Sequence, residues 1–321
     1  MTEVQVPLVA IQIGINSCDL AGSLRLFSEL GFANAGGHMI WGKPMSIQGL
    51  PPSARGQMYW LVGRQRRVQL EFFHLTNPAQ RPQAEDWRCC DLGWNRIGIA
   101  VPDLDAAKAV LAEWDIAVTG ESETPGEPRR LVFREPFVRC YVEVFEDGDA
   151  IPGGRALRHF DVDPAVVYAM ASVSDLESAR TYYVETLGMK IAEGVVIHRP
   201  EHEAMWGLEG ASTESFVVDG GGFLIEVVHY LDPVGRPKPD DYFVGDQGLM
   251  NIAVGSFEIE PALEAISRAR KQGYKVSDLA LIADAGGAYV LEPEREVEIG
   301  GMPEHMEEAF GYVPRAPFFG A

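Results

Sequence analysis

The sequence predicts an α+β protein built from four β-α-β-β-β modules, and three observations support this fold class. Four segments repeat one order of elements, a short apolar strand, then an acidic residue, then a helical stretch; they are residues 11–32, 95–114, 167–189 and 250–274. A later strand in each repeat carries a glutamate. Glu71 and Glu226 are 155 residues apart (226 − 71), and so are Glu143 and Glu298 (298 − 143), which indicates an internal duplication.

The helix of each module is expected to begin beside an acidic residue. A carboxylate there accepts hydrogen bonds from the free N–H groups of the first turn and faces the positive end of the helix dipole. The four acids are Asp19, Asp103, Asp175 and Glu258. Three helices are expected to end at a glycine, because glycine readily adopts the left-handed backbone of a helix end. These glycines are Gly31, Gly188 and Gly273.

The strand that carries the glutamate is expected to close each module. The four strands read VQLEFF, CYVEVF, FLIEVV and EVEIG. In the fourth module Glu292 is an alternative, but Glu292-Pro293 resembles the turn Glu135-Pro136 of the second module, so Glu298 is preferred. The modules then span about residues 8–80, 92–148, 164–232 and 246–303.

The chain is expected to form two tandem domains with two modules each. A length of 321 residues fits two domains of roughly 150 residues. The segment DGDAIPGGRA is rich in turn-forming residues and suggests a boundary near residue 152. The domains are residues 1–152 and 153–321, and the second ends in an aromatic tail.

Composition excludes some classes of partner. The chain has 27 Lys and Arg against 47 Asp and Glu, a formal net charge of −20, which disfavours nucleic acid and anionic membrane surfaces. No apolar run approaches the roughly 20 residues of a membrane span, and the first residues lack the basic region of a signal peptide. The expected location is therefore the cytoplasm, the expected partner is a small molecule, and a homodimer stays open.

The repeated pattern, with its [DE]-[LI] helix starts and its glutamate in the last strand, resembles the vicinal oxygen chelate superfamily. That superfamily includes glyoxalase I, bleomycin-resistance proteins, methylmalonyl-CoA epimerase and the extradiol ring-cleaving dioxygenases. The resemblance extends from about residue 8 to residue 303, and the two-domain length is most similar to the extradiol dioxygenases. It implies that two modules pair so that their sheets form a cup, and that the site lies inside the cup.

The resemblance also implies where a metal would bind. The superfamily takes metal ligands from the last strands, usually Glu, and from the first strands, usually His or sometimes Gln. The first-strand positions, seven residues before each helix-start acid, are Gln12, Arg96, Tyr168 and Asn251. None is a histidine, and Asn and Tyr replace imidazole poorly on iron. No cofactor and no metal ligand is therefore predicted, although Fe, Mn, Zn or Ni is not excluded.

The cup of the N-terminal half is expected to contain Gln12, Glu71, Arg96 and Glu143. A guanidinium cannot donate a lone pair to a metal, so Arg96 argues against a metal here. Two interpretations stay open. Arg96 forms an ion-paired plug with the two glutamates, or the four residues bind a substrate through a carboxylate or an enolate oxygen.

The cup of the C-terminal half is expected to contain Tyr168, Glu226, Asn251 and Glu298, and these are the candidate catalytic residues. A buried glutamate has a raised pKa and can move protons at neutral pH, while Tyr168 and Asn251 can polarise a carbonyl. The small residues Gly14 and Gly98 are expected to leave room above the sheets. The alternative is that the glutamates are satisfied by neighbouring polar groups and do no chemistry.

The function predicted from these residues is an enzyme that acts by acid–base chemistry on a small aromatic or oxygenated metabolite. One rival is a metal-dependent dioxygenase or glyoxalase-like lyase, and another is a binding protein that sequesters its ligand. The segment VVIHRPEHEAMWG is expected to be a loop in which His198 and His202 face solvent or the pocket rim and Trp206 touches substrate.

Overall fold

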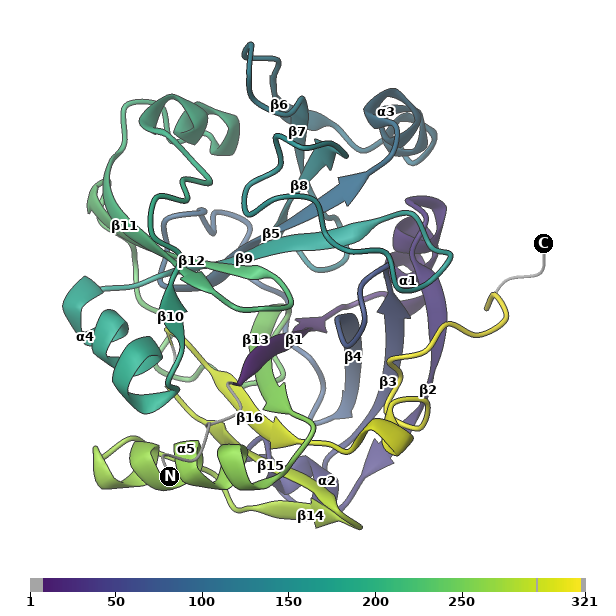
Figure 1. Ribbon diagram of the computed structural model, residues 1–321, viewed down its shortest axis with the longest axis vertical. Coiled ribbons are helices and arrows are strands. Elements are labelled where there is room, and N and C mark those ends of the chain that lie inside the picture. Colours follow the sequence, from purple (N-terminus) through teal and green to yellow (C-terminus); the bar gives the residue numbers. More distant parts are fainter. Residues whose placement is uncertain (1–7, 293, 319–321) are drawn as a thin grey trace, which may run out of the picture.

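The computed structural model describes residues 8–292 and 294–318, and it contains two curled eight-stranded sheets (Figure 1). The first sheet consists of β1 Val9–Asn16, β2 Ala33–Trp41, β3 Arg55–Val62, β4 Gln69–Asn77, β13 Gly248–Ser256, β14 Ala280–Ile282, β15 Ala285–Val290 and β16 Val297–Gly301. The second consists of β5 Gly93–Val101, β6 Val118–Ser122, β7 Arg130–Arg134, β8 Tyr141–Glu146, β9 Ala165–Ser172, β10 Lys190–Ile191, β11 Ser212–Asp219 and β12 Leu224–Asp232.

The helices are short. They are α1 Leu20–Glu29, α2 Lys43–Ser46, α3 Leu104–Glu113, α4 Leu176–Thr181 and α5 Glu260–Lys271, together with a π-helical turn at Tyr182–Thr186 and 3-10 segments at Pro200–Trp206 and Glu304–Met306. None of the helices in the described residues is long and apolar enough to span a membrane. The four β-α-β-β-β modules and the α+β class are therefore as expected.

The sheets join modules that are not consecutive in the chain. The strand orders are β14-β15-β16-β13-β1-β4-β3-β2 and β10-β11-β12-β9-β5-β8-β7-β6. The first module thus shares a sheet with the fourth through β1 and β13, and the second shares a sheet with the third through β5 and β9. The expectation that the two modules of each half form one cup is wrong. The division into residues 1–152 and 153–321 stays a proposal about two related halves, each of which gives one module to each sheet.

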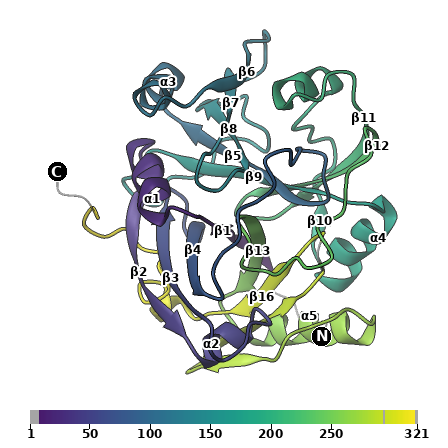
Figure 2. The ribbon, with the colours of Figure 1, turned by 180° about the vertical axis from the view of Figure 1, so that it is seen from behind.

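Consecutive modules meet through their helices. Figure 2 shows α1 beside α3 and α4 beside α5. The guanidinium of Arg25 on α1 stacks over the ring of Trp114, which follows α3. On the other side Arg268 of α5 donates to the carbonyl of Thr186. Helix contacts therefore link consecutive modules, while the sheets join the two halves of the chain to each other.

Most of the predicted helix ends are confirmed. Asp19, Asp103 and Asp175 accept backbone N–H bonds from residues three positions on, at 2.9–3.0 Å, as N-caps do. The fourth prediction is wrong, because α5 starts at Glu260 with Ile259 before it, and Glu258 makes no cap. The glycines expected at helix ends all have positive φ, at 100°, 74° and 87°; they are Gly31, Gly188 and Gly273.

Alternation along the first strands separates the core from the cups. In β1 and β5 the side chains of Ile13, Ile15, Ile97 and Ile99 are buried in one hydrophobic cluster that includes residues of both sheets and of the helices. The residues between them face the concave side. This alternation is why the four strand-borne glutamates point away from the core and into the cups.

Gly98 packs against a tyrosine from the neighbouring strand, so it does not leave the expected room. It pairs with Tyr168, and a Cβ at Gly98 would lie 2.2 Å from the Tyr168 ring. Gly14 pairs with Asn251 in the same way in the other sheet.

Gly98→Ala is therefore expected to destabilise the protein by about 1–3 kcal/mol, because the tyrosine ring must leave its position. Urea unfolding measures this change. Gly148→Ala is the control, since a Cβ there would meet nothing within 4 Å. Equal midpoints for the two variants would contradict the close packing.

Candidate functional site

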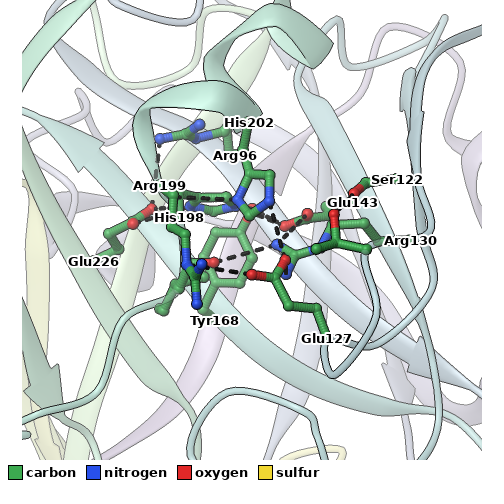
Figure 3. Close-up of polar contacts among 12 residues, drawn as sticks. Arg96, Ser122, Glu127, Arg130, Glu143, Tyr168, His198, Arg199, His202 and Glu226 are labelled. Carbon is green, nitrogen blue, oxygen red and sulfur yellow. Dashed lines mark hydrogen bonds and ion pairs between the residues drawn. The ribbon is translucent and has the colours of Figure 1, made fainter.

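The concave face of the second sheet, called here the closed cup, brings together Arg96, Glu143, Tyr168 and Glu226 (Figure 3). A fifth side chain, His198 from the loop between β10 and the 3-10 segment, lies among them. Its Nε2 is 2.8 Å from Glu143 Oε2 and its Nδ1 is 2.8 Å from Glu226 Oε2. The hydroxyl of Tyr168 donates to Glu143 Oε2 at 2.8 Å. The imidazole therefore bridges two carboxylates that face each other.

Arg96 is fully buried at one side of the closed cup. Its guanidinium is 3.4 Å from Glu226 Oε2 and 3.6 Å from Glu203 Oε1, and it stacks 4.5 Å over the Trp206 ring. Glu203 and Trp206 belong to the 3-10 segment Pro200–Trp206, which lies over the cup (Figure 3). Arg96 is therefore ion-paired with Glu226 and Glu203, and not with Glu71 and Glu143, the partners expected within the N-terminal half.

The charges of the closed cup neutralise one another. Burial disfavours the charged form of His198, but the carboxylates of Glu226 and Glu143 raise its pKa to about 9. Burial acts in the opposite direction on Glu143, yet His198 and Arg130 lower its pKa to about 2. The pKa of Glu226 is also lowered, against the effect of burial, by His198 and Arg96. At neutral pH these groups form a salt-bridged cluster.

The histidines of VVIHRPEHEAMWG were expected to face solvent or the pocket rim, but both are buried. His198 and His202 each have side chains that are 4% exposed, and the second lies 3.2 Å from Glu127. The proline between them rules out a regular helical pair, as expected, but the loop folds inward. The inward orientation of the histidines could be predicted from electrostatics, because buried carboxylates require cations close by.

The concave face of the first sheet, called here the open cup, contains a cavity of about 590 Å³. Glu71 and Glu298 lie at its floor. Glu71 accepts hydrogen bonds from Trp60 Nε1 at 2.9 Å and from the amide of Gln12. Glu298 accepts a hydrogen bond from the Tyr289 hydroxyl. Each carboxylate is thus held by neutral donors.

The negative charge of the two carboxylates in the open cup is not balanced by a described lysine or arginine of the lining. Burial, together with the charge of Glu298, raises the pKa of Glu71 well above its ordinary value, and Trp60 offsets this only in part. Burial raises the pKa of Glu298 to about 7. Among the described residues that line the cavity there is no lysine or arginine. The pair therefore retains a proton near neutral pH.

The walls of the cavity are mainly apolar and aromatic. They come from both ends of the first sheet and from the C-terminal tail, which contributes Phe310 and Tyr312. Beyond these the tail runs against β2 and β3, where the backbone N–H of Arg315 donates to the carbonyl of Asn34 at 2.6 Å and Phe318 packs on Tyr59. The tail thus closes one side of the cup.

Both edge strands of the first sheet, β2 and β14, contribute residues to the lining of the cavity. Met39 and Trp41 from β2 and Ile282 from β14 line it and are 48%, 64% and 50% exposed. An apolar rim of this kind favours entry of an apolar molecule.

The structure groups the predicted site residues differently from the sequence analysis. Gln12, Glu71 and Glu298 lie together in the open cup. Asn251 does not line the cavity; it is buried beside Gly14 with its Oδ1 unpartnered. The others meet in the closed cup; they are Arg96, Glu143, Tyr168, Trp206 and Glu226.

Two residues of the open cup were missed from the sequence. Trp60 and Tyr289 orient the two glutamates, and both lie on strands that pair directly with the glutamate strands. The register pairs Trp60 with Glu71 and Tyr289 with Glu298. Both residues can be found by identifying which residue lies opposite each glutamate on the neighbouring strand.

The cups do not fit the histidine-ligated iron that the resemblance implies. In the closed cup both nitrogens of His198 face carboxylates, and Arg96 cannot act as a ligand. In the open cup the Gln12 amide donates an N–H to Glu71, so its oxygen points elsewhere. In residues 8–292 and 294–318 no group of three or more His, Cys, Asp or Glu side chains is arranged to hold a metal ion.

Comparisons with known proteins agree with this architecture. Residues 165–280 match the family described as the Glyoxalase/Bleomycin resistance protein/Dioxygenase superfamily. A putative dioxygenase from Bacillus subtilis has a similar structure, with a TM-score of 0.64 and 12% identity over 98% of this chain and 93% of that one. Glyoxalase I from Zea mays gives a TM-score of 0.57 and 11% identity over 92% of each chain. A comparison with curated protein sequences gives no match.

The paired modules and their curled sheets give this chain the same fold as these two solved structures. The family match covers the third module and the start of the fourth, and the solved structures show the same fold along nearly the whole chain.

Proposed function

We propose that the open cup is an active site in which Glu298 and Glu71 transfer protons to and from a small, largely apolar molecule. The observation that supports this is the pair of carboxylates at the floor of an apolar cavity of about 590 Å³. A raised pKa near the working pH is what a general acid or base requires. Isomerisation, elimination and hydration are reactions that such a pair can catalyse.

The pair can supply an acid and a base together. Because two close carboxylates cannot both ionise easily, one keeps a proton while the other accepts one. Trp60 and Gln12 fix the orientation of Glu71, and Tyr289 fixes that of Glu298. The apolar walls exclude water from the reacting atoms, which strengthens each electrostatic contact. The base removes a proton from a C–H or O–H bond of the substrate.

The closed cup has a different role in this proposal. Glu226 and Tyr168 are already paired with His198 and Glu143, so we assign them to structure and not to proton transfer. Asn251 lies outside the cavity and receives no catalytic role.

Deuterium incorporation tests proton transfer even while the substrate and product are unidentified. The wild-type protein is incubated in D2O with a cell metabolite extract, and mass spectrometry records compounds that gain deuterium or change mass. Such compounds are expected with the wild type and with Glu113→Gln, an exposed control, but not with Glu71→Gln/Glu298→Gln. Equal incorporation by the double variant would refute the assignment.

The rate is expected to rise with pH through about 7, because Glu298, whose pKa is raised to about 7, must lose its proton to act as a base. A kcat/KM profile between pH 5 and 9 on the substrate from the deuterium screen measures this. A profile that is flat between pH 6 and 8 would exclude Glu298 as the base.

Two rival functions are tested by further measurements on the purified protein. A ligand that co-purifies and binds tightly without turnover favours sequestration. A stoichiometric divalent metal in protein purified without chelator, together with activity that EDTA abolishes, favours metal-dependent chemistry.

A further inference from the structure

We propose that the open cup selects organic cations, namely molecules in which an aromatic or other apolar body carries a protonated amine. The inference rests on the proposed function, because it names the substrate class of the same cavity. It is based on the charges and the aromatic walls of the cavity. Proton transfer alone requires neither an uncompensated charge nor aromatic walls.

The charge at the floor of the cavity is uncompensated. Glu71 and Glu298 face the same space, and among the described lining residues neither lysine nor arginine balances them. His38 is the histidine of the lining, and burial lowers its pKa, so it is neutral at pH 7. An ammonium group placed between the two carboxylates supplies the missing charge.

The walls suit the same ligand. Trp60, Tyr289 and Phe73 present aromatic rings to the cavity from the sheet, and Phe310 and Tyr312 present theirs from the tail. Aromatic faces attract cations through their quadrupoles, and the attraction grows where water is excluded. Methionine side chains add a polarisable apolar surface; they are Met39, Met45, Met58, Met302 and Met306.

An anionic ligand is disfavoured by the same features. A carboxylate or phosphate in this cavity would lie beside two carboxylates, and no described cation of the lining would face it. Protonating both glutamates relieves part of this repulsion but leaves the anion itself without a partner. The cavity therefore discriminates by charge as well as by shape.

Three indole compounds of nearly equal size test the proposal. Tryptamine carries an ammonium, tryptophol a hydroxyl and indole-3-acetate a carboxylate on the same ring. Isothermal titration calorimetry at pH 8 measures their affinities for the full-length protein. Tryptamine is expected to bind about ten-fold more tightly than tryptophol, and indole-3-acetate is expected to bind more weakly than both.

The variant Glu71→Gln/Glu298→Gln is expected to bind tryptamine and tryptophol within about two-fold of each other, while Glu113→Gln keeps the preference of the wild type. Thermal unfolding confirms that each variant is folded. The proposal is overturned if indole-3-acetate binds as tightly as tryptamine, if tryptamine shows no binding, or if the preference survives in the double variant. Binding is measured without turnover, so this test fails or succeeds independently of the proton-transfer assignment.

Discussion

Replacing Glu298 by glutamine is expected to lower kcat/KM about 10²- to 10⁴-fold on the compound that the protein converts. Glutamine preserves the volume of the side chain and can still accept the hydrogen bond from Tyr289. It cannot take up or release a proton at neutral pH, so the loss reports proton transfer itself. Steady-state kinetics at pH 8, with thermal unfolding as a check on folding, measures the change.

The partner glutamate gives the matched comparison. Glu71→Gln is expected to cause a similar loss, and the double variant is expected to lose little more than either single variant, because acid and base act as one unit. Glu113→Gln on α3 is the control that keeps full activity. If both single variants retain kcat and change only KM, the two glutamates bind substrate without moving protons, and the catalytic assignment fails.

The repeat could be predicted from the sequence because the same local requirements apply in each module. Asp19, Asp103 and Asp175 begin helices in the structure, as the free N–H groups of a first turn require. The fourth module departs from the rule, since α5 begins at Glu260 with a proline in its first turn. Local rules therefore identify the modules and most of their boundaries.

The pairing of modules was not readable because it depends on long-range contacts. All four first strands are short and apolar, so β1 carries no local sign that it pairs with β13 and not with β5. Because the pairing of modules was predicted wrongly, several residues were assigned to the wrong cup. Strand alternation still placed every glutamate on a concave face, but it did not tell which of them share that face.

The difference between the two cups comes from residues outside the repeat pattern. His198 contacts Glu143 and Glu226 from a loop, and the regular spacing of the glutamates along the sequence does not predict this contact. In the open cup no described lysine or arginine occupies the corresponding space, and Gln12 stands where the closed cup has Arg96. One duplicated scaffold thus carries a neutralised cluster in one cup and an uncompensated pair of acids in the other.

Replacing His198 by alanine is expected to destabilise the protein by about 3–5 kcal/mol near pH 6, because it leaves Glu143 and Glu226 buried without the cation between them. Urea unfolding measures the change. His305→Ala, in which an exposed histidine 3.6 Å from Asp284 is removed, is the control and is expected to have little effect. Adding Glu143→Gln and Glu226→Gln to His198→Ala is expected to recover part of the stability, because the uncompensated charges are then absent.

The pH dependence of this loss identifies its electrostatic origin. The pKa of His198 is raised to about 9, so its stabilising charge is fully present below its unfolded value of 6.5 and is lost as the pH rises through 9. The pKa of Glu143 is lowered to about 2, so its contribution is present above 4.5 and is lost as the pH falls through 2. The difference between wild type and His198→Ala is therefore expected to be largest between pH 4.5 and 6.5 and to shrink on both sides. A difference that stays constant from pH 5 to pH 10 would assign the loss to packing and not to the ion pairs.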